Sequence, residues 1–323
     1  MRLLGFGMRR AAGIPLVLAS GTAAVVYGIY RYGFYSPKRQ QNDDYHLPIP
    51  IPTQEQHDHC IALIDRLNAR PYEKVSIRSF DGLSLNGRYY HAQDGAPLAI
   101  LCHGYRGTPS RDFCGGADIC FSRGFNVLMI EHRAHGSSEG HSITFGVKER
   151  YDVLAWAEYA AERFGSGVKI LLCGISMGGA TVLMASELAL PANVRGILAD
   201  CPFTSPSEII QEVGRSAGLP MKLAYPPTAL AARVFGGFSL TGADAPEAVK
   251  HTKIPILLIH GEEDGLVPCG MGRIIAEANP RMIELHTFPG ARHGLSYLTD
   301  PERYTELVTE FSQKVFSDPE EQT

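Results

Sequence analysis

The residues of this 323-residue chain best suited to chemistry are a serine and its flanking glycines, Gly174-Ile175-Ser176-Met177-Gly178. An apolar run at 168–173 precedes them, and a segment of helical composition follows. Such a strand-to-helix turn lifts a serine hydroxyl above a sheet, and its tightness requires glycine two residues away on each side. The pattern predicts that Ser176 is a nucleophile. The alternative is a structural turn with an inert serine.

A nucleophilic serine needs a histidine that takes its proton and an acid that orients this histidine. Asp264 follows one strand-like apolar run, and His293 lies between glycine-containing turns after a later one. We therefore predict a catalytic set of Ser176, Asp264 and His293. Glu263 is the alternative acid, but Asp264 is favoured because a glycine follows it and lets the backbone turn.

The negative charge of a tetrahedral intermediate needs two backbone N–H groups, one after the nucleophile and one after an early strand. Met177 would supply the first. An expected strand at 97–103 ends in His103-Gly104, so the amide of Tyr105 would supply the second. We predict Tyr105 and Met177 as the oxyanion residues and a structural role for His103.

The other histidines are expected to have no catalytic role. His260 and His286 lie within expected strands, where they would be packed or hydrogen-bonded. His132, His135 and His141 are close enough in sequence to suggest a metal, but a loop with incidental histidines is the favoured interpretation. Since the chain also lacks CxxC and HExxH patterns, we expect no metal and no other cofactor.

Taken together, these segments resemble the α/β-hydrolase superfamily over about residues 70–317. The chain order of serine, acid and histidine is that of the superfamily and differs from chymotrypsin and subtilisin. A loop at 131–138, followed by Gly146, Glu149 and Asp152, is more narrowly similar to bacterial α/β-hydrolases with a serine-aminopeptidase-like or esterase-like core. It departs from the usual pattern at Glu131, where Asp is commoner, and at Ala134, where Gly is commoner.

The rest of the sequence is typical of the α/β-hydrolase fold. Apolar runs alternate with helical segments, which predicts a mostly parallel sheet with helices on both faces. The expected strands lie at 74–79, 83–90, 97–103, 125–131, 168–173, 194–200, 255–260 and 282–288, and the expected helices near 111–123, 147–163, 178–188, 270–278 and 301–316.

The segment at about 202–252 interrupts this alternation and is rich in apolar residues. We predict a helical cap insertion that covers the active site, excludes water and holds an apolar group of the substrate. The alternative is an insertion that only packs on the core.

The amino terminus carries a stretch without charge at 11–30, long enough to span a bilayer as a helix. We predict a single-pass membrane anchor within residues 1–35, on an undetermined side of the membrane. Secretion after cleavage of a signal peptide near Gly21 is the alternative. A proline-rich tether at 36–55 would lead into the hydrolase domain at 56–323.

The composition excludes some classes of function. Thirty basic and thirty-four acidic residues do not favour a nucleic-acid partner. Seven cysteines are an odd number and do not form a disulfide framework. Nothing in the sequence indicates an oligomeric state. The expected partners are a small-molecule acyl substrate and the membrane.

These features favour a serine hydrolase that cleaves carboxylic ester or thioester bonds through an acyl-enzyme intermediate. The alternative enzyme is a serine peptidase or amidase acting on short peptides. An alternative of another class is a catalytically silent, membrane-tethered binding module, for which a missing serine, acid or histidine would be expected.

Overall fold

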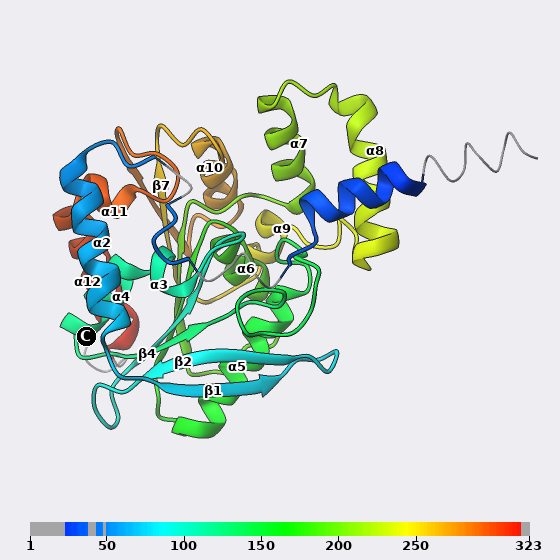
Figure 1. Cartoon of the computed structure of the whole chain (residues 1–323). Coiled ribbons are helices and arrows are strands. Elements are labelled where there is room, and N and C mark those ends of the chain that lie inside the picture. The colour runs from blue at the N-terminus through cyan, green and yellow to red at the C-terminus, as the bar shows by residue number, and fades with distance from the viewer. Residues whose placement is uncertain (1–22, 38–42, 48–49, 318–323) are drawn as a thin grey trace, which may run out of the picture.

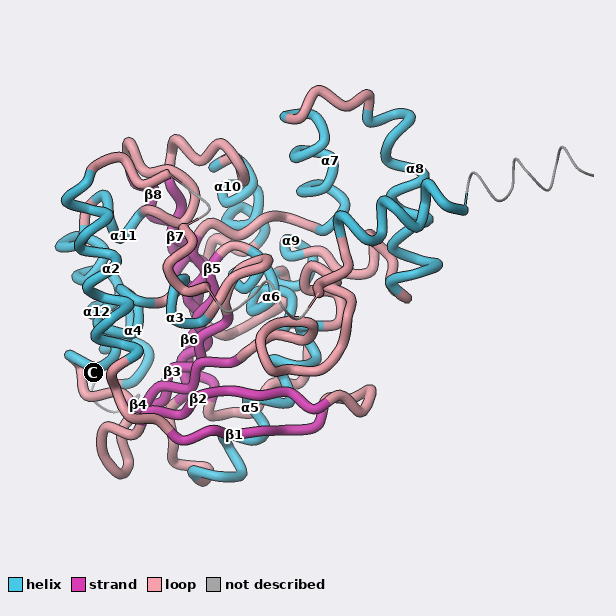
Figure 2. Tube along the Cα trace, viewed as in Figure 1, coloured by secondary structure: helices cyan, strands magenta, loops and turns pink. Residues whose placement is uncertain are grey.

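The computed structural model describes residues 23–37, 43–47 and 50–317. Within them lies one eight-stranded sheet of order β1-β2-β4-β3-β5-β6-β7-β8, with helices on either side (Figures 1 and 2). β2 pairs antiparallel with β1 and β4, and the other neighbours are parallel. The strands are β1 (Glu73–Arg78), β2 (Ser84–Tyr90), β3 (Leu98–Cys102), β4 (Asn126–Ile130), β5 (Ile170–Ile175), β6 (Val194–Asp200), β7 (Ile256–Gly261) and β8 (Ile283–Phe288).

The central strands are continuous apolar runs because both of their faces are covered. Every residue of β3, β4 and β7 is buried. All eight expected strands are present, each within two residues of its expected bounds. The predicted fold class, a mostly parallel sheet with flanking helices and a helical insertion, is confirmed.

Helices α5, α6, α9 and α10 pack on one face of the sheet, and α2, α4 and α12 pack on the other. The helix expected near 111–123 is divided in two at Phe113, whose backbone leaves the helical region (φ −118°, ψ 19°). Besides a helix formed by residues 23–33, the helices described outside the insertion are α2 (Gln54–Asn68), α3 (Pro109–Asp112), α4 (Cys114–Ser122), α5 (Glu149–Phe164), α6 (Met177–Ala185), α10 (Cys269–Ala278), α11 (Ser296–Thr299) and α12 (Pro301–Phe316).

The insertion between β6 and β7 is helical, as expected. It contains α7 (Pro206–Ser216), α8 (Met221–Ala231), the π-helical turn η2 (Ala232–Gly236) and α9 (Ala245–Val249). Figure 1 shows α7 and α8 projecting beyond the sheet, with the helix formed by residues 23–33 lying across α8.

The expected membrane anchor is wrong, and with it the localisation at a membrane. Among the described residues no helix is long and apolar enough to cross a bilayer. Residues 11–22, including the alternative cleavage site near Gly21, lie outside the described residues. In the described part of the stretch, at 23–30, Val26 and Tyr30 are buried against the insertion, in a cluster with Ala231 and Phe238. These two side chains are covered by protein, whereas Val25 and Tyr27 on the same helix are exposed.

The segment before α2 lies against the fold. Leu47 and Ile51 pack on the buried side of α2 around Cys60 and Ile64, and the Thr53 hydroxyl accepts the N–H of Gln56 to cap that helix. Residues 38–42 and 48–49 lie outside the described residues. The limits of a tether at 36–55 and a hydrolase domain at 56–323 stay a prediction.

Candidate active site

Ser176 lies at the turn between β5 and α6, at the carboxyl edge of the sheet. Its backbone has φ 54° and ψ −115°, a conformation that costs energy for any residue other than glycine. A Cβ added to Gly174 would lie 2.2 Å from the carbonyl oxygen of Gly178, and one added to Gly178 would lie 1.8 Å from that of Cys102. Both glycines are therefore required by the close approach of the backbone, as the sequence pattern predicted.

The structure brings the three expected side chains together. His293 Nε2 lies 2.8 Å from Ser176 Oγ, and His293 Nδ1 lies 2.7 Å from Asp264 Oδ2. With its proton on Nδ1, the imidazole donates to the carboxylate and accepts from the serine hydroxyl. This is the arrangement in which a histidine can remove a proton from serine.

Asp264 is held as a carboxylate. Burial alone would raise its pKa, but the imidazoles of His260 and His293 and the N–H of Val267 hold that pKa well below the usual range. Its second oxygen, Oδ1, accepts the N–H groups of Leu266 and Val267 at 2.9 and 2.8 Å. An ionised Asp264 can stabilise a protonated His293.

The alternative acid and the competing histidines lie elsewhere. Glu263 is exposed beside the buried Asp264. His260 is buried in β7, with Nε2 2.9 Å from the carbonyl oxygen of Val267. His286 is paired with an exposed glutamate on β8. Asp264 and His293 are thus the acid and the histidine that the fold brings to Ser176.

The loop after β3 passes directly beside Ser176. A Cβ added to Gly104 would lie 3.5 Å from Ser176 Cβ. Within the described residues no intramolecular hydrogen bond uses the N–H of Tyr105 or Met177, the two groups expected to form the oxyanion hole. Their N–H groups are therefore free to bind a negatively charged oxygen.

Polar side chains support this loop. Asp112 Oδ2 accepts the N–H of Gly104 at 2.8 Å. His135 Nε2 accepts the N–H of Arg106 at 3.1 Å. His103 Nε2 accepts the N–H of His132 at 3.1 Å, and its Nδ1 donates to the carbonyl oxygen of Gly104. His103 is thus a bridge between two loops, in agreement with the structural role expected for it.

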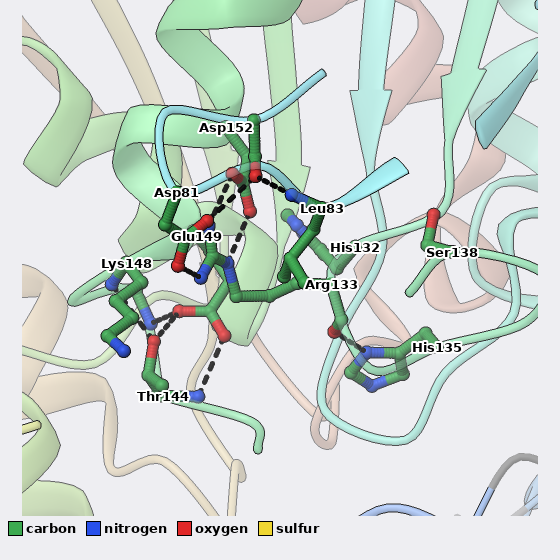
Figure 3. A network of polar contacts seen from close by, with 12 residues as sticks. Asp81, Leu83, His132, Arg133, His135, Ser138, Thr144, Lys148, Glu149 and Asp152 are labelled. Atoms are coloured by element: carbon green, nitrogen blue, oxygen red, sulfur yellow. Dashed lines mark hydrogen bonds and ion pairs between the residues drawn. The ribbon is translucent and has the colours of Figure 1, made fainter. Parts of the chain in front are cut away.

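The loop after β4 is anchored by the network in Figure 3. The buried Arg133 donates to Asp152 at 2.6 and 2.7 Å and to Asp81 at 2.9 and 3.1 Å. Burial would lower the pKa of Arg133, but the two carboxylates raise it above its ordinary value. Glu149 accepts the N–H groups of Thr144 and Gly146 at 2.7 and 2.9 Å. The network fixes the loop residues beside the site.

Two residues at the end of β6 were missed by the sequence reasoning. Asp200 ends the apolar strand β6 and Cys201 follows it, at the same edge of the sheet as Ser176. That position is the signal that could have found them. Burial raises the pKa of Asp200 to about 6. Cys201, Asp264 and His293 hold atoms able to bind a metal within 4.8 Å of one another, but Asp264 and His293 use theirs in the hydrogen bonds described above.

A cavity of about 660 Å³ opens over Ser176 and His293. Its wall includes residues of 43–47, Ile51, the loops after β3, β7 and β8, α4 and α11. The apolar side chains among them are Leu47, Ile51, Phe113, Leu266, Leu295, Tyr297 and Leu298. No residue of 202–252 lines it, so the expectation that the insertion holds the acyl group is wrong for this cavity. Leu223 and Phe235 of the insertion are instead 75% and 38% exposed.

Comparisons with known proteins agree with this architecture. A family model described as the alpha/beta hydrolase fold matches residues 97–233. The chain is 23% identical over 236 residues to YqkD of Bacillus subtilis, which covers 73% of this chain and 77% of that protein. It is 25% identical over 249 residues to the lysophosphatidylserine lipase ABHD12 of Rattus norvegicus, covering 70% of this chain and 58% of that protein.

Two solved structures are similar in fold. The esterase Pf2001 of Pyrococcus furiosus has a TM-score of 0.66 and 22% identity, over 88% of this chain and all of that one. Est1E of Butyrivibrio proteoclasticus, solved with ferulic acid bound, has a TM-score of 0.59 and 23% identity, over 76% of this chain and all of that one.

Proposed function

We propose that this chain, which has the α/β-hydrolase fold, is a serine hydrolase that cleaves carboxylic ester bonds, thioesters included. The fold and the matched relatives support a hydrolase of the α/β-hydrolase type. The observation that carries the serine mechanism is the unbroken line of hydrogen bonds from Ser176 through His293 to Asp264, of which Ser176 and His293 line a cavity.

In this proposal His293 Nε2 takes the proton of Ser176 as the serine oxygen attacks the carbonyl carbon of the ester. The carbonyl oxygen becomes negative, and the N–H groups of Tyr105 and Met177 stabilise it. As the intermediate collapses, the C–O or C–S bond breaks, and His293 passes its proton to the leaving alcohol or thiol.

Hydrolysis of the acyl-enzyme repeats these roles with water as the nucleophile. His293 removes a proton from the water, which attacks the acyl carbon, and returns a proton to Ser176 Oγ as the acid leaves. Asp264 keeps the proton of His293 on Nδ1 in the resting state and stabilises the imidazolium in both half-reactions.

The lining of the cavity favours a substrate with an apolar acyl group. Aliphatic and aromatic side chains such as Leu47, Ile51 and Leu298 line the cavity together with polar ones, and its volume lies in the range of sites for small molecules. Two of the similar proteins are named as an esterase and as a lysophosphatidylserine lipase, which agrees with an ester substrate.

A substrate panel tests the proposal. We expect turnover of p-nitrophenyl acyl esters and of the matched thioesters, and much slower cleavage of aminoacyl p-nitroanilides. A preference for the anilides would favour the peptidase alternative. If the purified protein cleaves neither class and does not react with a fluorophosphonate, the catalytic proposal fails and a binding role is favoured.

A further inference from the structure

The loop that carries Tyr105 is joined to a segment about seventy residues earlier in the chain. The Tyr105 hydroxyl donates to the carbonyl oxygen of Gly33 at 2.9 Å. The Arg106 guanidinium donates to the carbonyl oxygens of Tyr32 and Tyr35 at 2.6 and 3.3 Å. Residues 32–35 stand at the carboxyl end of the helix formed by 23–33.

This contact has a simple physical reason. The last carbonyls of a helix have no partner within the helix and need donors from elsewhere. The side chains of Tyr105 and Arg106 supply these donors, and the positive charge of Arg106 is favourable at the negative end of the helix dipole. Because the two partners satisfy each other, the loop and the helix end hold one another in place.

The ring of Tyr105 is fixed as well as its hydroxyl. It stacks on Phe145, with ring centroids 5.0 Å apart and an angle of 25°. Phe145 in turn meets the ring of Phe34 at 5.9 Å, and Phe34 is 1% exposed. Tyr105 therefore has its ring against one loop and its hydroxyl against the end of the helix.

The loop that carries Phe145 is joined to the same segment. The N–H of Ile143 donates to the carbonyl oxygen of Phe34 at 2.8 Å, and the N–H of Ser36 donates to that of His141 at 2.9 Å. On its other side this loop is held by Glu149 through Thr144 (Figure 3). Glu149 also accepts the N–H of Gly146. Residues 32–36 thus contact both of these loops.

Two backbone conformations show how closely these loops are constrained. Arg106 has φ 51° and Phe145 has φ 55°. Positive φ values of this size are unfavourable for residues other than glycine. Such conformations persist where the surrounding contacts determine them. The N–H of Tyr105 belongs to the preceding peptide unit of the same loop, which the contacts of Tyr105 and Arg106 hold against the helix end.

We propose that Tyr105 is a positioning residue whose hydroxyl, bound to Gly33, aims its own backbone N–H at the oxyanion. Residues 32–36 then complete the active site, although they lie far from the catalytic side chains in sequence. This inference rests on the proposed function, because it assigns a cause to the position of the second oxyanion donor.

The substitution Tyr105→Phe tests it in the full chain. The variant keeps the ring on Phe145 and loses only the hydrogen bond to Gly33. We expect kcat for p-nitrophenyl butyrate to fall about tenfold with KM within about twofold of the wild type, because a displaced donor weakens transition-state binding more than substrate binding. The rate of fluorophosphonate labelling should fall by a similar factor, since its phosphonyl oxygen enters the same hole.

Tyr225→Phe is the matched control. Tyr225 lies in the insertion, and its hydroxyl also makes one hydrogen bond, 2.7 Å from Ser207 Oγ. We expect this control to keep kcat within about twofold. Arg106→Met removes the neighbouring link to the segment and should lower kcat in the same direction as Tyr105→Phe. Thermal unfolding of each variant separates a displaced loop from a general loss of fold.

The outcomes are distinct. Wild-type kcat and labelling in folded Tyr105→Phe would overturn the inference and leave the proposed function intact. An equal loss in Tyr225→Phe would also overturn it, because the effect would then follow stability. A wild-type protein with neither turnover nor labelling would overturn the proposed function, and this inference with it.

Discussion

The backbone carbonyl of Asp200 accepts the N–H of Ser176 at 2.8 Å, so the residue that ends β6 is joined directly to the turn that ends β5. The side chain of Asp200 is 3% exposed, and Tyr304 donates to its Oδ2 at 3.2 Å. Within the described residues its Oδ1 has no hydrogen-bond partner. Ionisation of this carboxyl is therefore costly, which explains why its pKa is raised to about 6.

The raised pKa gives a prediction on stability. Between the ordinary pKa of an aspartate and about 6 the folded state binds more protons than the unfolded state, so the contribution of Asp200 to the free energy of unfolding falls as pH rises through this window. Asp200→Asn removes this dependence. The free energy of unfolding of the variant minus that of the wild type should therefore be about 1–2 kcal/mol larger at pH 8 than at pH 5. Urea unfolding at both pH values measures it, and a pH-independent difference would refute it.

The identity of the catalytic acid gives a second prediction. Asp264→Asn should lower kcat by about 10³–10⁴-fold, because an amide no longer favours the proton on Nδ1 of His293 or stabilises the imidazolium. Glu263→Gln changes the neighbouring exposed carboxylate and should leave kcat unchanged. Steady-state kinetics on one ester decides between the two acids, and the reverse ranking would show that Glu263 has the role.

The fold and the side chains of Ser176, Asp264 and His293 were predicted from local sequence patterns. The strands are visible because apolar runs end at glycines and prolines, and Ser176 is visible because its turn tolerates glycine alone at 174 and 178. Asp264 and His293 were found from their places after late strands. Each of these signals lies within about ten residues of sequence.

The features that were missed depend on contacts between distant segments. An apolar stretch has the same composition whether lipid or protein covers it, so the burial of Val26 and Tyr30 against the insertion could not be distinguished from a membrane span. The wall of the cavity was assigned to the insertion because its apolar residues suggested a cap. Only the tertiary structure brings Leu47 and Ile51 to that wall instead.

The composition of this wall gives a third prediction. Leu298 on α11 lines the cavity, and Leu298→Trp should fill part of it. The ratio of kcat/KM for p-nitrophenyl octanoate to that for the butyrate should fall about tenfold. Phe235→Ala in the insertion is the control and should leave this ratio within about twofold. If this ratio changed in Phe235→Ala and not in Leu298→Trp, the insertion would be the part of the chain that holds the acyl group.

The central claim is that Ser176 carries the acyl group during turnover, and mass spectrometry of acid-quenched reactions tests it most directly. With a p-nitrophenyl ester in excess, the peptide that contains Ser176 should gain the mass of the acyl group. Ser176→Ala should stay folded, gain no such mass and lose at least about 10³-fold in kcat. Hydrolysis by Ser176→Ala at the wild-type rate, or an acyl group on another residue of the wild type, would contradict the account.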